Sequence, residues 1–355
     1  MATTLEEAPA LGTAGGKRRS SVSPWAVLLV MLLALLPVLT KMTGLVSSYT
    51  YLQLSLMMVF SIAVLGLNLL TGFNGQISLG HGAFFAVGAY TAAILIDRYG
   101  LPYWATLPAA ALVCFVIGYM FGFPALKLEG HYLALATLAL AIAVPQMLKY
   151  RHLEDLTGGV QGINLVKPDA PFGLPLSPDQ WMYLVVLAVA CVMFWLAGNL
   201  LDSRMGRAMM AIRDHGMAAE TMGIDNARVK TITFGISALF TGVAGALHAI
   251  IFEFVAPDSF RLELSISLLV GAVVGGIASL PGAVLGGIFV QVIEKYADAI
   301  TRFVAQNVHL PIELEPWTFY GIMLIALIYL MPNGIAGGVA SLWRLVSRRA
   351  GRTSG

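Results

Sequence analysis

The chain has 355 residues and a formal net charge of +2; 58% of its residues are hydrophobic and only 11% are charged. A soluble globular protein carries about 25% charged residues, so this composition argues against a soluble fold. It predicts an all-α polytopic membrane protein, whose apolar side chains face lipid instead of being hidden from water. The two cysteines, Cys114 and Cys191, lie within apolar segments and are expected to be small core residues.

The chain is expected to form one membrane domain, over residues 24–340, between two cytoplasmic tails. Residues 1–23 are poor in apolar side chains and predict a disordered tail, and residues 341–355 form a basic tail. No small-residue cleavage site follows the first apolar segment, so an uncleaved span is expected there instead of a signal peptide. A span needs about 20 residues. About ten transmembrane or re-entrant segments are predicted: 24–43, 50–71, 77–96, 103–123, 131–149, 181–200, 231–254, 264–279, 281–301 and 317–337.

Two of these segments come from the division of one long apolar region, 264–302. As a single helix this region would measure about 58 Å, against about 30 Å for the hydrocarbon core of a bilayer. It also contains Ser279-Leu280-Pro281-Gly282, and proline disrupts the hydrogen-bond ladder of a helix. We therefore expect two shorter segments, the first of them a candidate re-entrant helix.

The distribution of charge predicts the orientation. With the N-terminus inside and ten crossings, 13 of the 21 lysine and arginine residues fall on the cytoplasmic side. Because cytoplasmic loops are enriched in lysine and arginine, both termini are expected to be cytoplasmic. The loop 201–230 is then cytoplasmic, and the proline-rich loop 150–180 is periplasmic and expected to be an ordered cap or a partner-facing loop.

The cytoplasmic loop 201–230 contains a predicted helix. From Gly206 to Met222 the sequence is rich in helix formers, methionine and charge, and Gly223 is a typical residue after a helix C-terminus. A short amphipathic helix under the membrane would present methionines, which suit adaptable partner surfaces. An ordinary cytoplasmic linker is the alternative interpretation.

The most informative segment is GLNLLTGFNGQISLGHGAFFAVGAY, from Gly66 to Tyr90. Its flanks are apolar, but Thr71 to Gly82 is polar and rich in glycine. Lipid offers no water to unpaired backbone groups, so such a break must be buried in protein or line a wet cavity. Transporters place their pathways at broken helices. The predicted pathway or gate residues are Asn68, Thr71, Gly72, Asn74, Gly75, Gln76, Ser78, Gly80, His81 and Gly82.

The sequence leaves two interpretations of His81 open. It could contact or gate the substrate, because polar residues at membrane depth are costly and often functional. It could instead be a buried histidine that pairs with a backbone carbonyl freed by the break. The same two interpretations, contact with substrate or pairing with the backbone, apply to the polar residues around it.

Other chemistries lack a motif. Gly15-Gly16-Lys17-Arg18 has neither the glycine spacing nor the hydroxyl residue of a nucleotide-binding loop, so no ATP hydrolysis is expected from this chain. No hydrolase, zinc-protease or redox motif occurs, and the six histidines are scattered, so we expect no enzyme, no metal and no cofactor.

Ion-coupled carriers usually need a buried acid in the middle of a span. Glu253 and Glu294 fall near segment ends, which argues against such a carrier. A channel or carrier that acts alone remains the alternative.

Several stretches resemble the LivM-type permease subunits of bacterial branched-chain amino acid ABC importers. The resemblance runs from about residue 50 to 340 and rests on LNLLTGFNGQISLGHGAFFAVGAY at 67–90, GHYLALATLA at 130–139, LTGGVQGI at 156–163, GRAMMAIRDHGMAAETMGI at 206–224 and GAVVGGIASLPGAVLGG at 271–287. It implies an ABC importer permease fold in the inner membrane. It also implies three kinds of partner: a second, LivH-type permease, two ATPase subunits and a periplasmic binding protein. Permeases for urea, amides and aromatic acids look similar, so the substrate stays open.

The resemblance also gives the loop 201–230 a role. Ala218-Ala219-Glu220, with Gly223 after it, is similar to the segment that docks into the ATPase in ABC importers, although the order of alanine and glutamate departs from the usual pattern. A rigid helix on short connections would transmit a movement of the ATPase. The coupling residues that it implies are Arg213, Met217, Ala218, Ala219, Glu220 and Gly223.

Overall fold

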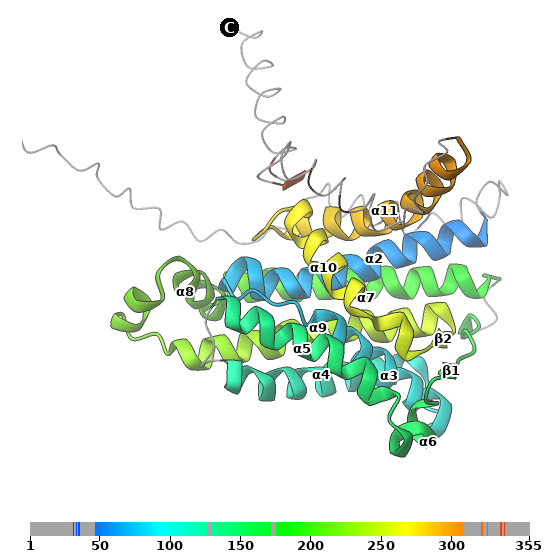
Figure 1. Ribbon diagram of the computed structural model, residues 1–355, viewed down its shortest axis with the longest axis horizontal. Coiled ribbons are helices and arrows are strands. Elements are labelled where there is room, and N and C mark those ends of the chain that lie inside the picture. Colours follow the sequence, from blue (N-terminus) through cyan, green and yellow to red (C-terminus); the bar gives the residue numbers. More distant parts are fainter. Residues whose placement is uncertain are drawn as a thin grey trace, which may run out of the picture. The chain divides into compact units, whose positions relative to one another are not determined.

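The computed structural model describes residues 47–125, 130–171 and 175–307, and the single residues 31, 33, 35, 321, 325, 334, 335 and 337. The chain divides into two compact units, Met1–Leu45 and Val46–Gly355, and the helices labelled in Figure 1 all belong to the second unit. The predicted tails and, apart from those single residues, the predicted spans 24–43 and 317–337 lie outside the described residues.

The described part of the second unit consists almost entirely of helices, as the composition predicts. In chain order they are α2 (Ser48–Asn68), α3 (His81–Tyr99), α4 (Tyr103–Ala125), α5 (His131–Leu148), α6 (Glu154–Thr157), α7 (Pro178–Asp202), α8 (Arg204–Thr221), α9 (Asn226–Phe252), α10 (Leu262–Gly275) and α11 (Leu280–Asn307). A π-helical turn, Leu69–Phe73, continues α2, and short 3-10 turns lie at Arg151–Leu153 and Pro257–Phe260. Two-residue strands, β1 (Ile163–Asn164) and β2 (Phe254–Val255), pair antiparallel with Ile163 opposite Val255.

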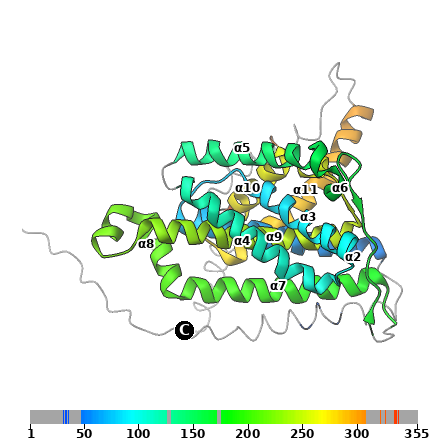
Figure 2. The ribbon, with the colours of Figure 1, turned by 90° about the horizontal axis from the view of Figure 1, so that it is seen from below.

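Helices α2 and α9 form the centre of this unit. Within their most apolar stretches, 78% and 83% of the residues are buried, against 22–28% for α4, α5 and α7. Figure 2 shows α5 and α7 on opposite sides of the layer that holds α2, α3 and α9. Among the described helices, five are long and apolar enough to cross a membrane, namely α2 with its π-helical turn, α4, α5, α7 and α9.

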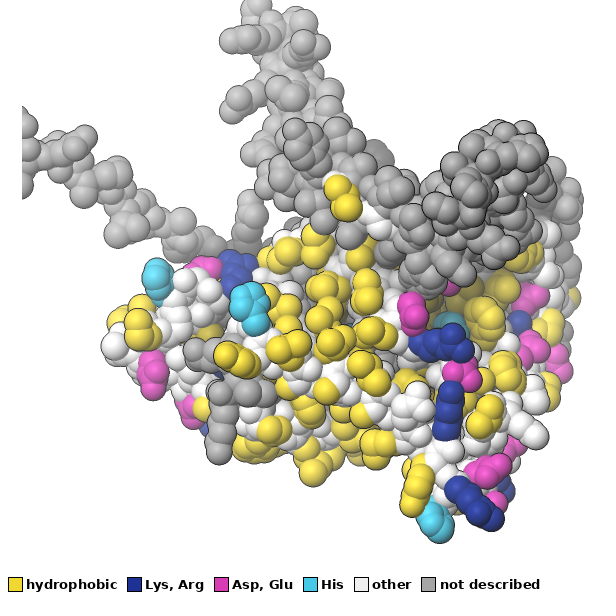
Figure 3. All heavy atoms as spheres, viewed as in Figure 1, with side chains coloured by type: hydrophobic (Ala, Val, Ile, Leu, Met, Phe, Trp, Pro, Cys, Tyr) yellow, Lys and Arg dark blue, Asp and Glu magenta, His cyan; other side chains and the backbone are white. Residues whose placement is uncertain are grey.

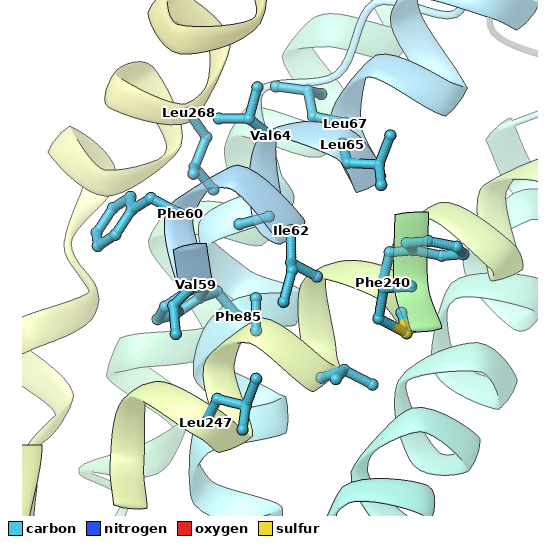
Figure 4. Close-up of a cluster of buried hydrophobic side chains, with 14 of the residues drawn as sticks. Val59, Phe60, Ile62, Val64, Leu65, Leu67, Phe85, Phe240, Leu247 and Leu268 are labelled. Atoms are coloured by element: carbon cyan, nitrogen blue, oxygen red, sulfur yellow. The ribbon is translucent and has the colours of Figure 1, made fainter. Parts of the chain in front are cut away.

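The core lies where α2 meets α3, α9 and α10. Figure 4 shows Val59, Ile62 and Leu65 of α2 among Phe85, Leu247 and other apolar side chains, and all five named here are at most 1% exposed. The outer helices instead expose large apolar residues such as Leu112, Ile142 and Trp195. Such an arrangement is stable in lipid, because the exposed apolar faces need not be hidden from water.

The first break is shorter than the sequence predicts. We expected it from Thr71 to Gly82, but apolar residues keep the chain helical up to Phe73, and α3 already begins at His81. Only residues 75–80 of this stretch lack regular structure. The predicted span 77–96 therefore starts too early, because its first four residues belong to the break.

The second break lies before the proline instead of at it. Helix α10 ends at Gly275 and α11 begins at Leu280, and the connection contains two residues with positive φ, Gly276 (125°) and Ala278 (58°). Pro281 lies in the first turn of α11, where its missing N–H group costs nothing. The 14 residues of α10 span about 21 Å, less than the bilayer core, so the expected pair of shorter segments is confirmed while its boundary is corrected.

The two ends of the bundle differ in structure. Helix α8 lies at one end, and α6, β1 and β2 form a cap at the other (Figures 1 and 2). In the cap, Lys167 Nζ lies 2.8 Å from Asp179 Oδ1 and 3.0 Å from Glu253 Oε1, so it joins α7 to the end of α9. Burial alone would lower the pKa of Lys167, but its hydrogen bonds to these two carboxylates and their charges outweigh burial and raise it. The described parts of the loop 150–180, residues 150–171 and 175–180, are thus tied to α7 and to the end of α9.

Candidate functional site

The first break is enclosed by several helices. On α5, the Thr137 hydroxyl accepts a hydrogen bond from Leu79 N over 2.9 Å. On α9, the Lys230 carbonyl accepts one from Gln76 Nε2 over 3.3 Å. The irregular backbone is therefore satisfied by protein groups, which is one of the two conditions under which a break survives at membrane depth.

The break also closes on itself. Gln76 N donates to the Leu70 carbonyl over 3.1 Å, and the Thr71 hydroxyl donates to the Gln76 carbonyl over 3.0 Å. Between them Gly75 takes a φ of +76°, which is strained for any residue with a side chain. Gln76 is buried, whereas Gly75 and Ile77 are exposed. The polar side chains thus hold the backbone of a tight loop.

Asn68 connects the first break to the second. Its Oδ1 accepts a hydrogen bond from Ala278 N over 2.8 Å, and its Nδ2 donates to the Ser279 carbonyl over 3.0 Å. Asn68 is 1% exposed, so these bonds are sheltered from water. Gly72 lies directly beside the same pair, and a side chain there would collide with Asn68 and Ala278. The two breaks are therefore one connected structure.

His81 forms the start of α3 and lies in a chain of hydrogen bonds. Its Nε2 is 2.6 Å from Ser237 Oγ, and that hydroxyl donates to the Gly66 carbonyl over 2.6 Å. Because the single hydroxyl hydrogen of Ser237 is used there, Nε2 must carry a hydrogen and donate. Nδ1 then accepts from Ser78 Oγ over 3.0 Å. Both ring nitrogens are occupied within the protein, in a ring that is 1% exposed.

The start of α3 also packs closely against its neighbours. A Cβ atom on Gly80 would lie 2.7 Å from the Thr137 carbonyl oxygen, so only glycine fits this approach to α5. Gly82 N donates to Ser265 Oγ of α10 over 2.9 Å. Asn74 differs from these residues: it is buried, and neither atom of its side-chain amide has a partner among the described residues.

Helix α8 covers the predicted coupling segment but is not one rigid helix. It starts at the cap residue Ser203, whose Oγ accepts from Met205 N and Gly206 N, and it ends before Gly223, whose φ is +84°. Inside it, His215 has extended backbone angles of −156° and 93°, which kink the helix. The predicted end is confirmed, and the expected single rigid helix is corrected to two helical pieces.

The exposed surface of the second piece matches most of the predicted coupling residues. Met217 is 85% exposed, and Ala218, Glu220 and Gly223 are exposed as well. Ala219 is only 4% exposed and packs into the core, so a partner could not touch its side chain directly. Exposed and buried residues alternate because successive side chains point to different faces of a helix, and the sequence alone does not show which face is buried.

Arg213 connects α8 to the first break. Its Nη1 donates to the Gly72 carbonyl over 3.2 Å, and its Nε donates to Asp214 Oδ1 over 2.9 Å. A Cβ atom on Gly75 would lie 3.1 Å from Arg213 Cγ. The two segments that the sequence singled out separately are therefore in direct contact.

Three neighbours of the break were not predicted from the sequence: Thr137, Ser237 and Ser265. Each is a hydroxyl residue inside a largely apolar helix, and each is at most 1% exposed. A buried hydroxyl must find a hydrogen-bond partner, so such residues mark where a helix meets irregular backbone.

Comparison with known proteins agrees with this architecture. The family described as "Branched-chain amino acid transport system / permease component" matches residues 50–331. The LivM permease protein of the high-affinity branched-chain amino acid transport system of Escherichia coli is 34% identical over 286 residues, covering 74% of this chain and 67% of that protein.

More distant relatives include a second kind of permease. The LivH permease protein of Salmonella typhimurium is 24% identical, with 78% of this chain and 91% of that protein covered. The BraD permease protein of Pseudomonas aeruginosa is 26% identical, with coverages of 81% and 96%. A search of the solved structures finds no match. A helical bundle with a broken central helix and a match over residues 50–331 thus place the chain in the branched-chain amino acid transport system permease family.

Proposed function

We propose that this protein is a permease subunit of an ABC importer for branched-chain amino acids and forms the translocation pathway with a second, LivH-type permease. Family membership supports the class, and the names of the relatives support the substrate. One structural observation carries the mechanism: Arg213 joins α8 to the Gly72 carbonyl at the first break.

Helix α8 would receive the movement of the ATPase subunits. Its exposed residues Met217, Ala218, Glu220, Met222 and Gly223 offer a flexible apolar surface with one acid. A shift of α8 would change the Arg213 contact and so the position of the break. ATP would be hydrolysed on the partner subunits, and each conformational state must bind its ligands differently for the cycle to run.

The first break would act as a gate. Asn68, Gln76, Ser78 and His81 are buried and use their polar groups to hold backbone or one another. Because their polar groups are already engaged within the protein, these residues are better suited to moving together as a unit than to binding substrate. Through Asn68 the unit includes the turn 276–279, so both breaks would move together.

The opposite end of the bundle would face the periplasm. There the cap of α6, β1 and β2 is fixed by the ion pairs of Lys167 and by the hydrogen bond from Lys149 Nζ to Asp258 Oδ1, 2.7 Å long. The hydrogen bond from Lys149 holds the pKa of Asp258 below its ordinary value, and Arg261 adds to this shift. A rigid, charged cap suits the docking of a periplasmic binding protein, with α8 and both termini in the cytoplasm of a cell with an inner membrane.

Reconstitution into vesicles tests this function. We expect ATP-driven uptake of labelled leucine only when the chain is combined with a second permease, two ATPases and a binding protein. Uptake by the chain alone would support a carrier or channel instead. Competition by urea or amides, in place of leucine, isoleucine and valine, would assign the transporter to another solute of the same family.

A further inference from the structure

A pocket of about 1090 Å³ lies at the capped end of the bundle, opposite α8. Its walls come from the first half of α2, the end of α9, the turn Pro257–Phe260, the start of α10 and α11. Figure 3 shows a hollow on this side of the molecule, with hydrophobic side chains at its base and charged side chains around it. The predicted gate lies elsewhere, and this pocket has no part in the proposed coupling.

The base of the pocket is aromatic. Phe60, Phe85 and Phe260 line it and are at most 6% exposed. The His248 ring lies among them, 5.3 Å from the ring centre of Phe85 and stacked 4.8 Å from that of Phe252. Ligand sites typically combine such apolar walls with a few placed polar groups.

Two polar atoms of residues that line this pocket have no partner among the described residues. They are Oε2 of Glu263, in the first turn of α10, and Nδ1 of His248. Both atoms are buried, and a buried polar atom without a hydrogen bond is unfavourable. A ligand that carries hydrogen-bond donors would satisfy both.

The charged residues around the pocket differ in how they are paired. Asp258 already accepts hydrogen bonds from Lys149 and Arg261, at 2.7 and 3.3 Å. Arg261 has a largely exposed side chain, so its guanidinium group can also reach an anion at the pocket. Two further charged residues line the pocket and have partners: Lys295 Nζ donates to Gln53 Oε1 over 2.8 Å, and Glu294 Oε2 accepts from Gln291 Nε2 over 3.4 Å. The Glu263 carboxylate, with its unpartnered Oε2, therefore suits a cationic group, and Arg261 suits an anionic one.

We propose that this pocket is an acceptor site for an α-amino acid with an aliphatic side chain. The ammonium group pairs with Glu263 and His248, the carboxylate pairs with Arg261, and the side chain lies on the aromatic base. The proposal rests on the proposed function for its substrate class and adds to it a binding site inside the permease. Neutral solutes such as urea would use neither charged group.

Direct binding to the complete transporter complex in nanodiscs, without binding protein, tests this site. The probes are leucine, leucinol, which lacks the carboxylate, and 4-methylpentanoate, which lacks the ammonium group. Because a charged hydrogen bond is lost, Glu263→Gln should weaken leucine binding about tenfold and leave 4-methylpentanoate unchanged. Arg261→Gln should weaken leucine binding but leave leucinol unchanged. A misfolded variant would lose all three ligands and cannot produce this crossed pattern.

Glu154→Gln is the matched control, because Glu154 is an exposed acid at the same end and does not line the pocket. It should bind leucine like the unmodified protein. The site is overturned if the unmodified complex does not bind leucine, or if the Glu263 and Arg261 variants bind leucine as tightly as the unmodified complex does. Uptake by the same complex distinguishes this failure from failure of the proposed function. If the complex takes up leucine with ATP but the variants bind all ligands as the unmodified complex does, the site is rejected and the transport function stands. If the variants show the expected ligand-specific losses but the complex does not take up leucine, the transport function is rejected and the site stands.

Discussion

Arg213 on α8 donates a hydrogen bond to the backbone carbonyl of Gly72, 141 residues earlier in the chain, over 3.2 Å. This bond joins the helix that is proposed to meet the ATPase to the π-helical turn that leads into the break proposed to act as the gate. Because the acceptor is a backbone atom of the π-helical turn Leu69–Phe73, which leads directly into the break, a displacement of α8 acts on the path of the chain there and not on a mobile side chain.

Replacement of Arg213 should therefore uncouple transport from ATP hydrolysis. Arg213→Ala is expected to lower leucine uptake about tenfold, which corresponds to the loss of an interaction of about 1.4 kcal/mol, while the assembled complex still hydrolyses ATP. Arg207→Ala is the control, because this exposed arginine of the same helix binds the Asp202 carbonyl instead of the break. Uptake and hydrolysis that fall together in Arg213→Ala would argue against a coupling role.

The coupling surface predicts the effect of two further changes. Glu220→Lys should abolish transport without preventing membrane insertion, because it reverses the charge of an exposed acid next to Met217 and Ala218. Gly223→Pro should do the same, because proline cannot adopt the φ of +84° found there and loses the N–H that donates to the Glu220 carbonyl. Uptake in vesicles and the amount of inserted protein measure both.

Crosslinking provides a control at neighbouring positions. Cysteines placed at Met217, Ala218 and Glu220 should crosslink to the ATPase in an active complex, because these residues are exposed. A cysteine at Ala219 should not, because that side chain is 4% exposed. If no position from 217 to 222 forms a crosslink, α8 is not the docking helix.

Bulky residues in the first break should block the gate. Gly75→Val must adopt a φ near +76°, and Gly80→Val must overlap the Thr137 carbonyl, so both should lower uptake sharply. His81→Gln should lower it less, because glutamine can still donate and accept hydrogen bonds. Gly198→Val is the control, since a Cβ built on that helical glycine has no contact within 4 Å apart from its chain neighbours and the backbone of its own helix. Unchanged uptake in the first two variants would place the pathway elsewhere.

The link between the two breaks should contribute to stability. Asn68→Ala removes the partner of the part-buried Ala278 N–H and frees the Ser279 carbonyl, which should destabilise the complex by about 1–3 kcal/mol. Thermal unfolding of the purified complex measures this effect. Asn164→Ala, at an exposed asparagine of β1, should leave the Tm unchanged, and an equal Tm for Asn68→Ala would show that the bridge does not hold the breaks together.

The sequence predicts the helices better than their contacts. Apolar length locates all eight predicted spans that fall on described residues, and glycine and polar residues locate the first break and the end of α8 at Gly223. The second break could not be placed, because Pro281 is tolerated in the first turn of a helix and the backbone turns at Gly276 and Ala278 instead. The kink at His215 lies directly before Gly216, but a single glycine is tolerated inside many helices and does not by itself predict a kink.

The contacts between residues of the site could not be predicted from the sequence either. Asn68 and Ala278 are 210 residues apart, and their pairing depends on how α2 packs against the α10–α11 turn. The hydroxyl groups of Ser237 and Ser265 reach their hydrogen-bond partners, His81 and Gly82, only because α3 packs against α9 and α10. Packing of distant segments, and not local propensity, decides such contacts.

The most direct test of the proposed coupling is a distance measured between spin labels at Ile77, an exposed residue of the first break, and Asn164, in the cap at the opposite end. In the complete complex, this distance should change between the nucleotide-free and the ATP-trapped state. The change should disappear in Arg213→Ala while nucleotide binding persists. A distance that stays constant in the unmodified complex, or that changes equally without Arg213, would contradict the claim that α8 moves the break.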